Sequence, residues 1–142
     1  MSDPQSDISY TEVLRRFEGT GQRLASALGD YMRAADADYT VSLTKPWRDD
    51  VRELARGMLM YPELILTYPA PSEYTTLYAM YQQWAGRFKE LAYRVLDLVS
   101  ALDRADIVAT GDELQRVVAA LKVVSALTEA RVIYVNSLAQ NQ

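Results

Sequence analysis

The sequence contains no cysteine and no histidine, and these two absences exclude much catalytic and metal chemistry. Without cysteine there is no disulfide, no thiolate nucleophile and no cysteine–metal site. The absence of cysteine also does not distinguish an oxidising from a reducing compartment. Without histidine the chain lacks the commonest general base and the commonest transition-metal ligand. The Glu-x-x-His pairs of helical di-iron proteins are missing for the same reason. We therefore expect no metal and no cofactor, and we predict that the protein is not an enzyme.

Lysine is scarce and long apolar runs are missing. The only lysines are Lys45, Lys89 and Lys122, and the net charge is −4, which argues against non-specific binding to the phosphates of nucleic acid. No apolar run approaches the roughly 18 residues that a membrane span needs, so we expect no membrane span. The polar and acidic segment Met1–Asp7 does not resemble a signal peptide. If the chain is complete, it is expected to be cytoplasmic.

The length and composition are those of one folded unit. A chain of 142 residues with 49% hydrophobic residues can bury a core without disulfides or metals. We therefore predict a single domain over residues 1–142, with a frayed N-terminus at residues 1–8.

One stretch, Tyr74–Leu102, carries the clearest structural signal in the sequence. If Tyr74 is position a of a heptad, every a and d position over four heptads is apolar or aromatic, which is typical of a long helix along a helical seam. The a positions are Tyr74, Tyr81, Phe88, Val95 and Leu102, and the d positions are Leu77, Trp84, Leu91 and Leu98. We predict a helix from about Ser72 to Arg104, and Gly86 is the expected place for any bend.

Capping signals and proline positions indicate three further helices. Ser9 and Glu12 form a capping box before a helix that ends near Ala37, and a second helix starts near Thr44. Pro62 is expected to stop or bend that second helix at Tyr61-Pro62.

The last helix is predicted from a second capping box, Thr110–Glu113, to about Leu138. The short connection Ala105–Ala109 makes this helix the antiparallel partner of the helix before it. In the first helix, the nearby glycines Gly19 and Gly21 indicate a kink or a close approach of another helix. The predicted fold is an all-α, elongated, antiparallel four-helix bundle whose second helix is kinked at Tyr61-Pro62.

The last helix is apolar around most of its circumference. From Val117 to Val135 its only charges are Lys122, Glu129 and Arg131, so it is either the central helix or in contact with another chain. This pattern gives the leading functional hypothesis, a non-catalytic interaction module that forms a homo-oligomer or docks a protein partner through the last helix. The residues predicted at the interface are Val123, Leu127 and Tyr134.

An aromatic cluster gives the alternative hypothesis, a bundle that binds or senses a small molecule. Tyr68, Tyr74, Tyr78 and Trp84 could line a pocket, because tyrosine and tryptophan offer a broad apolar face and a polar tip. The competing interpretation is packing inside the bundle, since Tyr74 and Trp84 occupy seam positions.

A row of arginines could bind an anion. Arg48, Arg52 and Arg56 are four residues apart and share a helix face. This row is the only feature that could serve an enzyme working by electrostatics. The competing interpretation is a solvated face with intrahelical ion pairs, Asp49 with Arg52 and Glu53 with Arg56.

Overall fold

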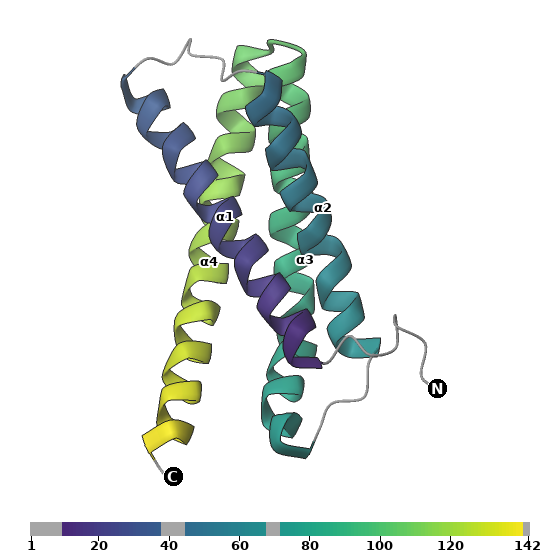
Figure 1. The fold of residues 1–142 in the computed structure, drawn as a ribbon. Coiled ribbons are helices and arrows are strands. Elements are labelled where there is room, and N and C mark those ends of the chain that lie inside the picture. The colour runs from purple at the N-terminus through teal and green to yellow at the C-terminus, as the bar shows by residue number, and fades with distance from the viewer. Residues whose placement is uncertain (1–9, 38–44, 68–71, 141–142) are drawn as a thin grey trace.

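The computed structural model describes residues 10–37, 45–67 and 72–140, which form four α-helices and one short 3₁₀ turn (Figure 1). The helices are α1 (Tyr10–Ala37), α2 (Lys45–Thr67), α3 (Thr75–Asp103) and α4 (Ile107–Gln140), and the turn η1 is Ser72–Tyr74. There is no strand in these ranges, and the predicted all-α four-helix fold is confirmed. At about 1.5 Å per residue, the 34 residues of α4 extend over roughly 50 Å, so the bundle is elongated.

α3 is the central helix of the bundle. It packs against both α2 and α4, whereas α1 packs chiefly on α2. Seven of the nine predicted seam positions are buried, whereas Trp84 on α3 and Tyr74, the last residue of η1, are half-buried. A third row, Ala85, Ala92 and Val99, is buried beside the seam. This wide apolar face lets α3 cover two neighbours at once. Within the described residues α4 packs extensively on α3 alone, so α4 is not the central helix.

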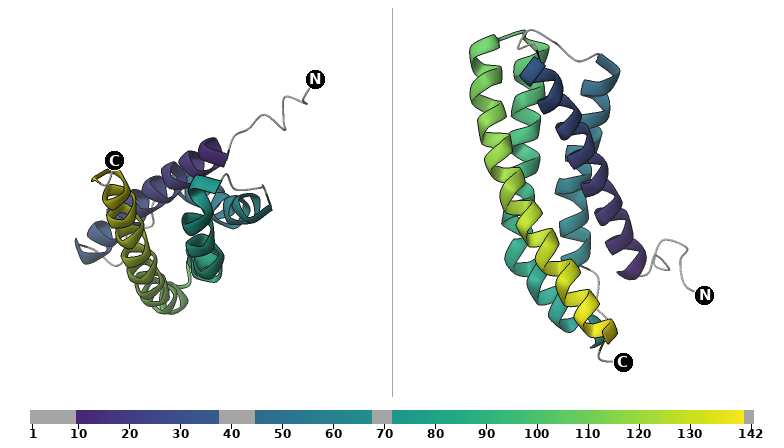
Figure 2. Two further views of the ribbon diagram at one scale, coloured as in Figure 1. Left: turned by 90° about the horizontal axis from the view of Figure 1, so that it is seen from below. Right: turned by 90° about the vertical axis from the view of Figure 1, so that its left-hand side faces the viewer.

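The bundle is not closed between α1 and α4. Within the described residues these two helices approach each other closely at isolated points at most. α1 runs obliquely across the bundle, and α4 diverges from α3 towards its C-terminal end (Figures 1 and 2). The C-terminal part of α4 is therefore covered less by neighbouring helices than the other three helices are.

The turn between α3 and α4 is shorter than the sequence predicts. α4 begins at Ile107 rather than Thr110, and the Asp106 carboxylate accepts a hydrogen bond of 3.0 Å from the backbone N–H of Ala109. This bond satisfies one of the unpaired N–H groups of the first turn, so Asp106 is the N-cap. The capping box predicted at Thr110 lies inside the helix, which corrects that prediction.

The end of α3 is a Schellman motif built around an alanine. The N–H of Asp106 donates to the carbonyl of Ala101 at 3.1 Å, and the N–H of Ala105 donates to that of Leu102 at 3.0 Å. This pattern requires a left-handed residue at the position of Ala105, whose φ is 53°. Glycine usually occupies this position because a Cβ is strained there.

Pro62 does not end α2, which continues to Thr67 with Pro62 buried inside it. The stop expected at Tyr61-Pro62 is thus wrong, and a bend there stays a prediction. Pro62 has no N–H to donate to the carbonyl four residues earlier, so the helix loses one bond at that point.

The close approach of two helices occurs at Gly57 and not at the glycines of α1. A Cβ at Gly57 would lie 3.0 Å from Cγ2 of Thr20 on α1, whereas a Cβ at Gly19 would meet nothing within 4 Å. A Cβ at Gly21 would make ordinary contact with Sδ of Met58 at 3.9 Å. The sequence therefore predicted a close helix contact of α1 but assigned it to the wrong glycine.

Candidate functional site

A cavity of about 210 Å³ lies where the bundle is open between α1 and α4. Side chains of all four helices line it, and most of its wall is apolar. The principal apolar residues are Phe17, Met58, Trp84, Phe88, Leu121 and Val124. Two other hollows on the described residues are similar in size or larger, but this one has the most apolar wall of the three.

Aromatic rings from α1 and α3 form one wall of this cavity. Phe17 meets Phe88 edge to face with ring centroids 4.9 Å apart, and it meets Tyr81 in the same way at 5.9 Å. Tyr81 in turn contacts Trp84, at 6.1 Å and 73° between the ring planes. These are the arrangements that aromatic quadrupoles prefer, so the contacts between the rings stabilise the positions of the side chains in this wall.

One ion pair connects α1 and α4 beside the cavity. Nη1 of Arg131 donates a hydrogen bond to Oε1 of Glu18, and both residues line the cavity. The Arg131 side chain is only 14% exposed, and that of Glu18 is 35% exposed. The pair therefore places a largely buried guanidinium next to an apolar space.

The predicted aromatic site is only partly reproduced. Trp84 lines the cavity. Tyr78 has a structural role, since its hydroxyl donates to the carbonyl of Leu66 at 3.1 Å and so satisfies a backbone group in the last turn of α2. Tyr74 is half-buried against the core, and Tyr68 lies outside the described residues.

The cavity also contains residues that sequence reasoning missed. Phe17 and Glu18 on α1 and Thr128 and Arg131 on α4 lie on its wall. Phe17 was visible as part of an apolar helix face, but the pattern of one helix does not show which other helix that face meets.

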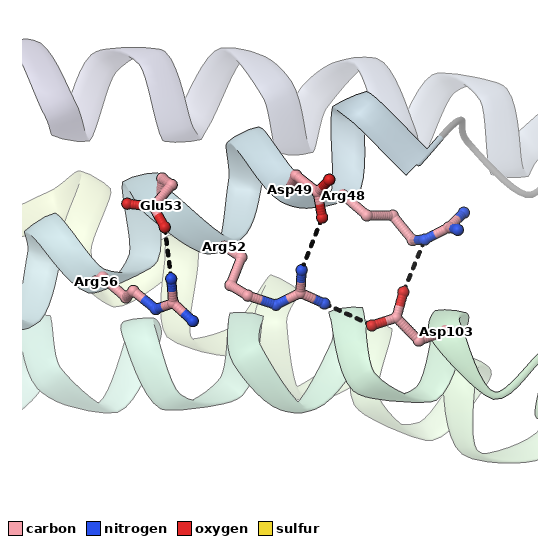
Figure 3. Close-up of polar contacts among 6 residues, drawn as sticks. All are labelled: Arg48, Asp49, Arg52, Glu53, Arg56 and Asp103. Atoms are coloured by element: carbon pink, nitrogen blue, oxygen red, sulfur yellow. Dashed lines mark hydrogen bonds and ion pairs between the residues drawn. The ribbon is translucent and has the colours of Figure 1, made fainter.

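The arginine row is paired with carboxylates (Figure 3). Arg52 bonds Asp49 at 3.0 Å, and Arg56 bonds Glu53, so both predicted intrahelical pairs are present. Arg48 and Arg52 also converge on Asp103, the last residue of α3. We conclude that Asp103 already occupies the position that an anion would take.

The three residues predicted at the interface on α4 differ in exposure. Val123 is 41% exposed, whereas Leu127 and Tyr134 are half-buried and Tyr134 packs against the core. Across the described residues, six of the eight exposed large hydrophobic side chains belong to α4. They are Ile107, Val108, Val123, Val132, Ile133 and Val135.

The described ranges lack both a metal-binding cluster and a membrane-spanning helix. They contain no group of three acidic side chains placed to hold a metal ion. Nor does any helix in them combine the length and the apolar character that crossing a membrane requires.

No protein-family model, no curated protein and no solved structure matches the chain.

Proposed function

We propose that the protein is a non-catalytic helical-bundle module that self-associates through the outward face of α4. The observation that carries this proposal is the concentration of exposed large hydrophobic side chains on α4, two of which, Val123 and Ile133, lie on this face. Exposing such side chains to water is unfavourable, and covering them with another protein surface removes that cost.

The outward face has the spacing of a helical seam. Exposed apolar residues recur at alternating intervals of four and three residues, which is the a/d pattern of a coiled coil. They are Ala119, Val123, Ala126, Ala130 and Ile133. The alanines would allow a second helix to approach closely, and Val123 and Ile133 would supply most of the buried apolar area.

The charges beside this seam favour a second copy of the chain as the partner. Lys122 and Glu129 lie on the same border of the seam, seven residues apart, and both are exposed. Borders of this kind face each other in an antiparallel pair of identical helices. Lys122 of one copy would then meet Glu129 of the other, and the reciprocal pair would form by symmetry.

The oligomeric state tests the proposal directly. We expect native mass spectrometry and sedimentation velocity to show a concentration-dependent dimer. Val123→Glu and Ile133→Glu should each shift the protein to monomer while circular dichroism stays helical, because both positions are exposed. Met60→Glu is the matched control, since Met60 is 50% exposed but lies on α2. A wild-type protein that stays monomeric at all concentrations would contradict self-association.

A charge exchange tests the orientation of the two helices. Lys122→Glu places like charges together and should weaken dimerisation, and adding Glu129→Lys should restore it. Each exposed pair contributes only about 0.2–1 kcal/mol, so the single variant should change the dimer dissociation constant several-fold. If the double variant were weaker than the single one, the antiparallel arrangement would be wrong.

A further inference from the structure

The cavity between α1 and α4 is separate from the outward face of α4. Val124 is 7% exposed and lines the cavity, whereas Val123, the preceding residue, is 41% exposed and belongs to the outward face. A helix presents residues i and i+1 about 100° apart, so the two surfaces are on different sides of α4. Whatever fills the cavity is therefore independent of self-association.

The size of the cavity sets the size of its occupant. An apolar cavity of about 150 Å³ inside a helical protein holds benzene. A volume of about 210 Å³ therefore accommodates one or two fused rings. Exposed residues on the rim, including Gln22 and Ser125, give the space an opening to solvent.

The wall of the cavity favours a flat aromatic molecule. Trp84 is half-buried and leaves part of its ring open to further edge-to-face or stacked contacts, while Phe17 and Phe88 are buried in the wall behind it. Sδ of Met58 on α2 is a polarisable atom, and thioethers make favourable contacts with aromatic rings.

Arg131 adds a charged group to this apolar wall. A guanidinium carries five N–H groups in a fixed planar fork that matches a carboxylate. Within the described residues Arg131 uses one nitrogen, Nη1, for its bond to Glu18. Its other N–H groups can donate to an acceptor on a molecule in the cavity. Charge and burial would strengthen this bond, and repulsion from the Glu18 carboxylate, which also lines the cavity, would offset part of that gain.

We propose that the cavity binds a compact aromatic carboxylic acid of one or two fused rings. The rings would lie among Phe17, Trp84 and Phe88, and the carboxylate would accept hydrogen bonds from Arg131, which stays bonded to Glu18. The site would bind the acid without chemical change.

Titration with 2-naphthoate tests this site, with neutral 2-naphthamide as the comparison ligand. We expect calorimetry to show one molecule bound per chain. Of the two tryptophan indole N–H signals, that of Trp84 should shift on binding and that of Trp47 should not, because Trp47 does not line the cavity. Failure of 2-naphthoate to bind at millimolar concentration would overturn the proposal.

Two variants locate the bound molecule. Gly21→Leu places a side chain into the cavity from a position where a Cβ has room, so it should abolish binding while the protein stays folded. Gly19→Leu makes the same change two residues away, at a position that does not line the cavity, and should bind normally. Equal binding by both variants would place the ligand elsewhere.

The role of the guanidinium is tested by a second pair of variants. Arg131→Met should weaken 2-naphthoate about tenfold or more, since a hydrogen bond to a charged group is lost, and should change 2-naphthamide much less. Arg116→Met is the control, because Arg116 is also on α4 and paired with a glutamate but does not line the cavity. Equal losses for both ligands in Arg131→Met would refute recognition of the carboxylate.

Discussion

Nε of Arg48 donates a hydrogen bond of 2.8 Å to Oδ1 of Asp103, and the two residues are 55 positions apart in the chain. Each is poorly placed for its own helix: Arg48 is in the first turn of α2, and Asp103 is the last residue of α3. A helix dipole disfavours a cation at its N-terminus and an anion at its C-terminus. Because the two charges pair with each other, the unfavourable interaction of each with its own helix dipole is reduced. The pair also holds the N-terminal end of α2 against the C-terminal end of α3.

Removing this carboxylate should weaken the fold slightly. Asp103→Asn leaves Arg48 and Arg52 without their shared partner, and all three side chains are partly exposed. We expect the free energy of unfolding to fall by about 0.5–1 kcal/mol, and by less in 1 M salt, where exposed charges are screened. Urea titration measures this change. Asp97→Asn, an exposed position on the same helix, is the control. An effect independent of salt would mean that charge is not the cause.

Replacing Ala105 by glycine should stabilise the protein. Ala105 has a φ of 53°, and a left-handed conformation costs an L-residue roughly 1–2 kcal/mol. We expect Ala105→Gly to raise the free energy of unfolding by about 0.5–1 kcal/mol, since glycine also loses more chain entropy on folding. Thermal unfolding followed by circular dichroism measures the change. Ala119→Gly, inside α4, should have the opposite effect.

Gly19 on α1 and Gly57 on α2 should respond to substitution by alanine in opposite directions. Gly19→Ala should raise the free energy of unfolding by up to about 1 kcal/mol, because alanine is the better helix former and nothing lies near its Cβ. Gly57→Ala should lower it by about 1 kcal/mol, because its Cβ would press on Cγ2 of Thr20. Thr20 is β-branched within a helix and cannot easily turn away. Denaturant melts of the double variant Thr20→Ser with Gly57→Ala should show recovery, and no recovery would reject the steric explanation.

Alkaline pH should destabilise the protein partly through Tyr31. This residue is buried and stacks on Trp47 with ring centroids 5.6 Å apart. Burial raises the pKa of its hydroxyl above the usual 10.0. The hydroxyl therefore loses its proton at a lower pH in the unfolded chain than in the folded protein. The contribution of the neutral Tyr31 hydroxyl to the free energy of unfolding is complete below pH 10.0 and is lost as the pH rises through the raised pKa.

The variant Tyr31→Phe keeps the stacked ring and removes the ionisable group. Its free energy of unfolding should therefore fall less steeply than that of the wild type above pH 10.0 in urea titrations at successive pH values. Tyr93→Phe, at a residue that is 58% exposed, should follow the wild type. Parallel curves for all three proteins would show that Tyr31 does not contribute.

The helices and the core of α3 were predictable because they depend on local periodicity. The heptad from Tyr74 to Leu102 identified buried residues correctly, since seam positions face neighbouring helices wherever those neighbours are. The intrahelical pairs of Arg52 and Arg56 were predictable for the same reason, because residues three apart on a helix are always neighbours.

The start of α4 was predicted wrongly because two capping signals compete. Asp106 and Thr110 both have suitable side chains, but only Thr110 is followed three residues later by a glutamate, Glu113, which completes a capping box. Ile107 and Val108 are 71% and 77% exposed, so the first turn of α4 does not contribute to the core and has no amphipathic pattern to reveal it.

The cavity could not be predicted because it depends on how separate helices are placed. Phe17 meets Phe88 only through the oblique path of α1, and Glu18 pairs with Arg131 across 113 positions of chain. No local spacing determines these meetings. The aromatic cluster of the sequence therefore located one residue of the cavity, Trp84, and assigned Tyr78 to it although Tyr78 caps α2.

The order in which the helices pack has a consequence for the speed of folding. α1 packs on α2, α2 on α3 and α3 on α4, so most contacts join helices that follow one another in the sequence. Proteins dominated by such short-range contacts fold in microseconds to milliseconds, because little loop entropy is lost before contacts form. During synthesis each helical hairpin can form as soon as its second helix has left the ribosome, without waiting for the end of the chain.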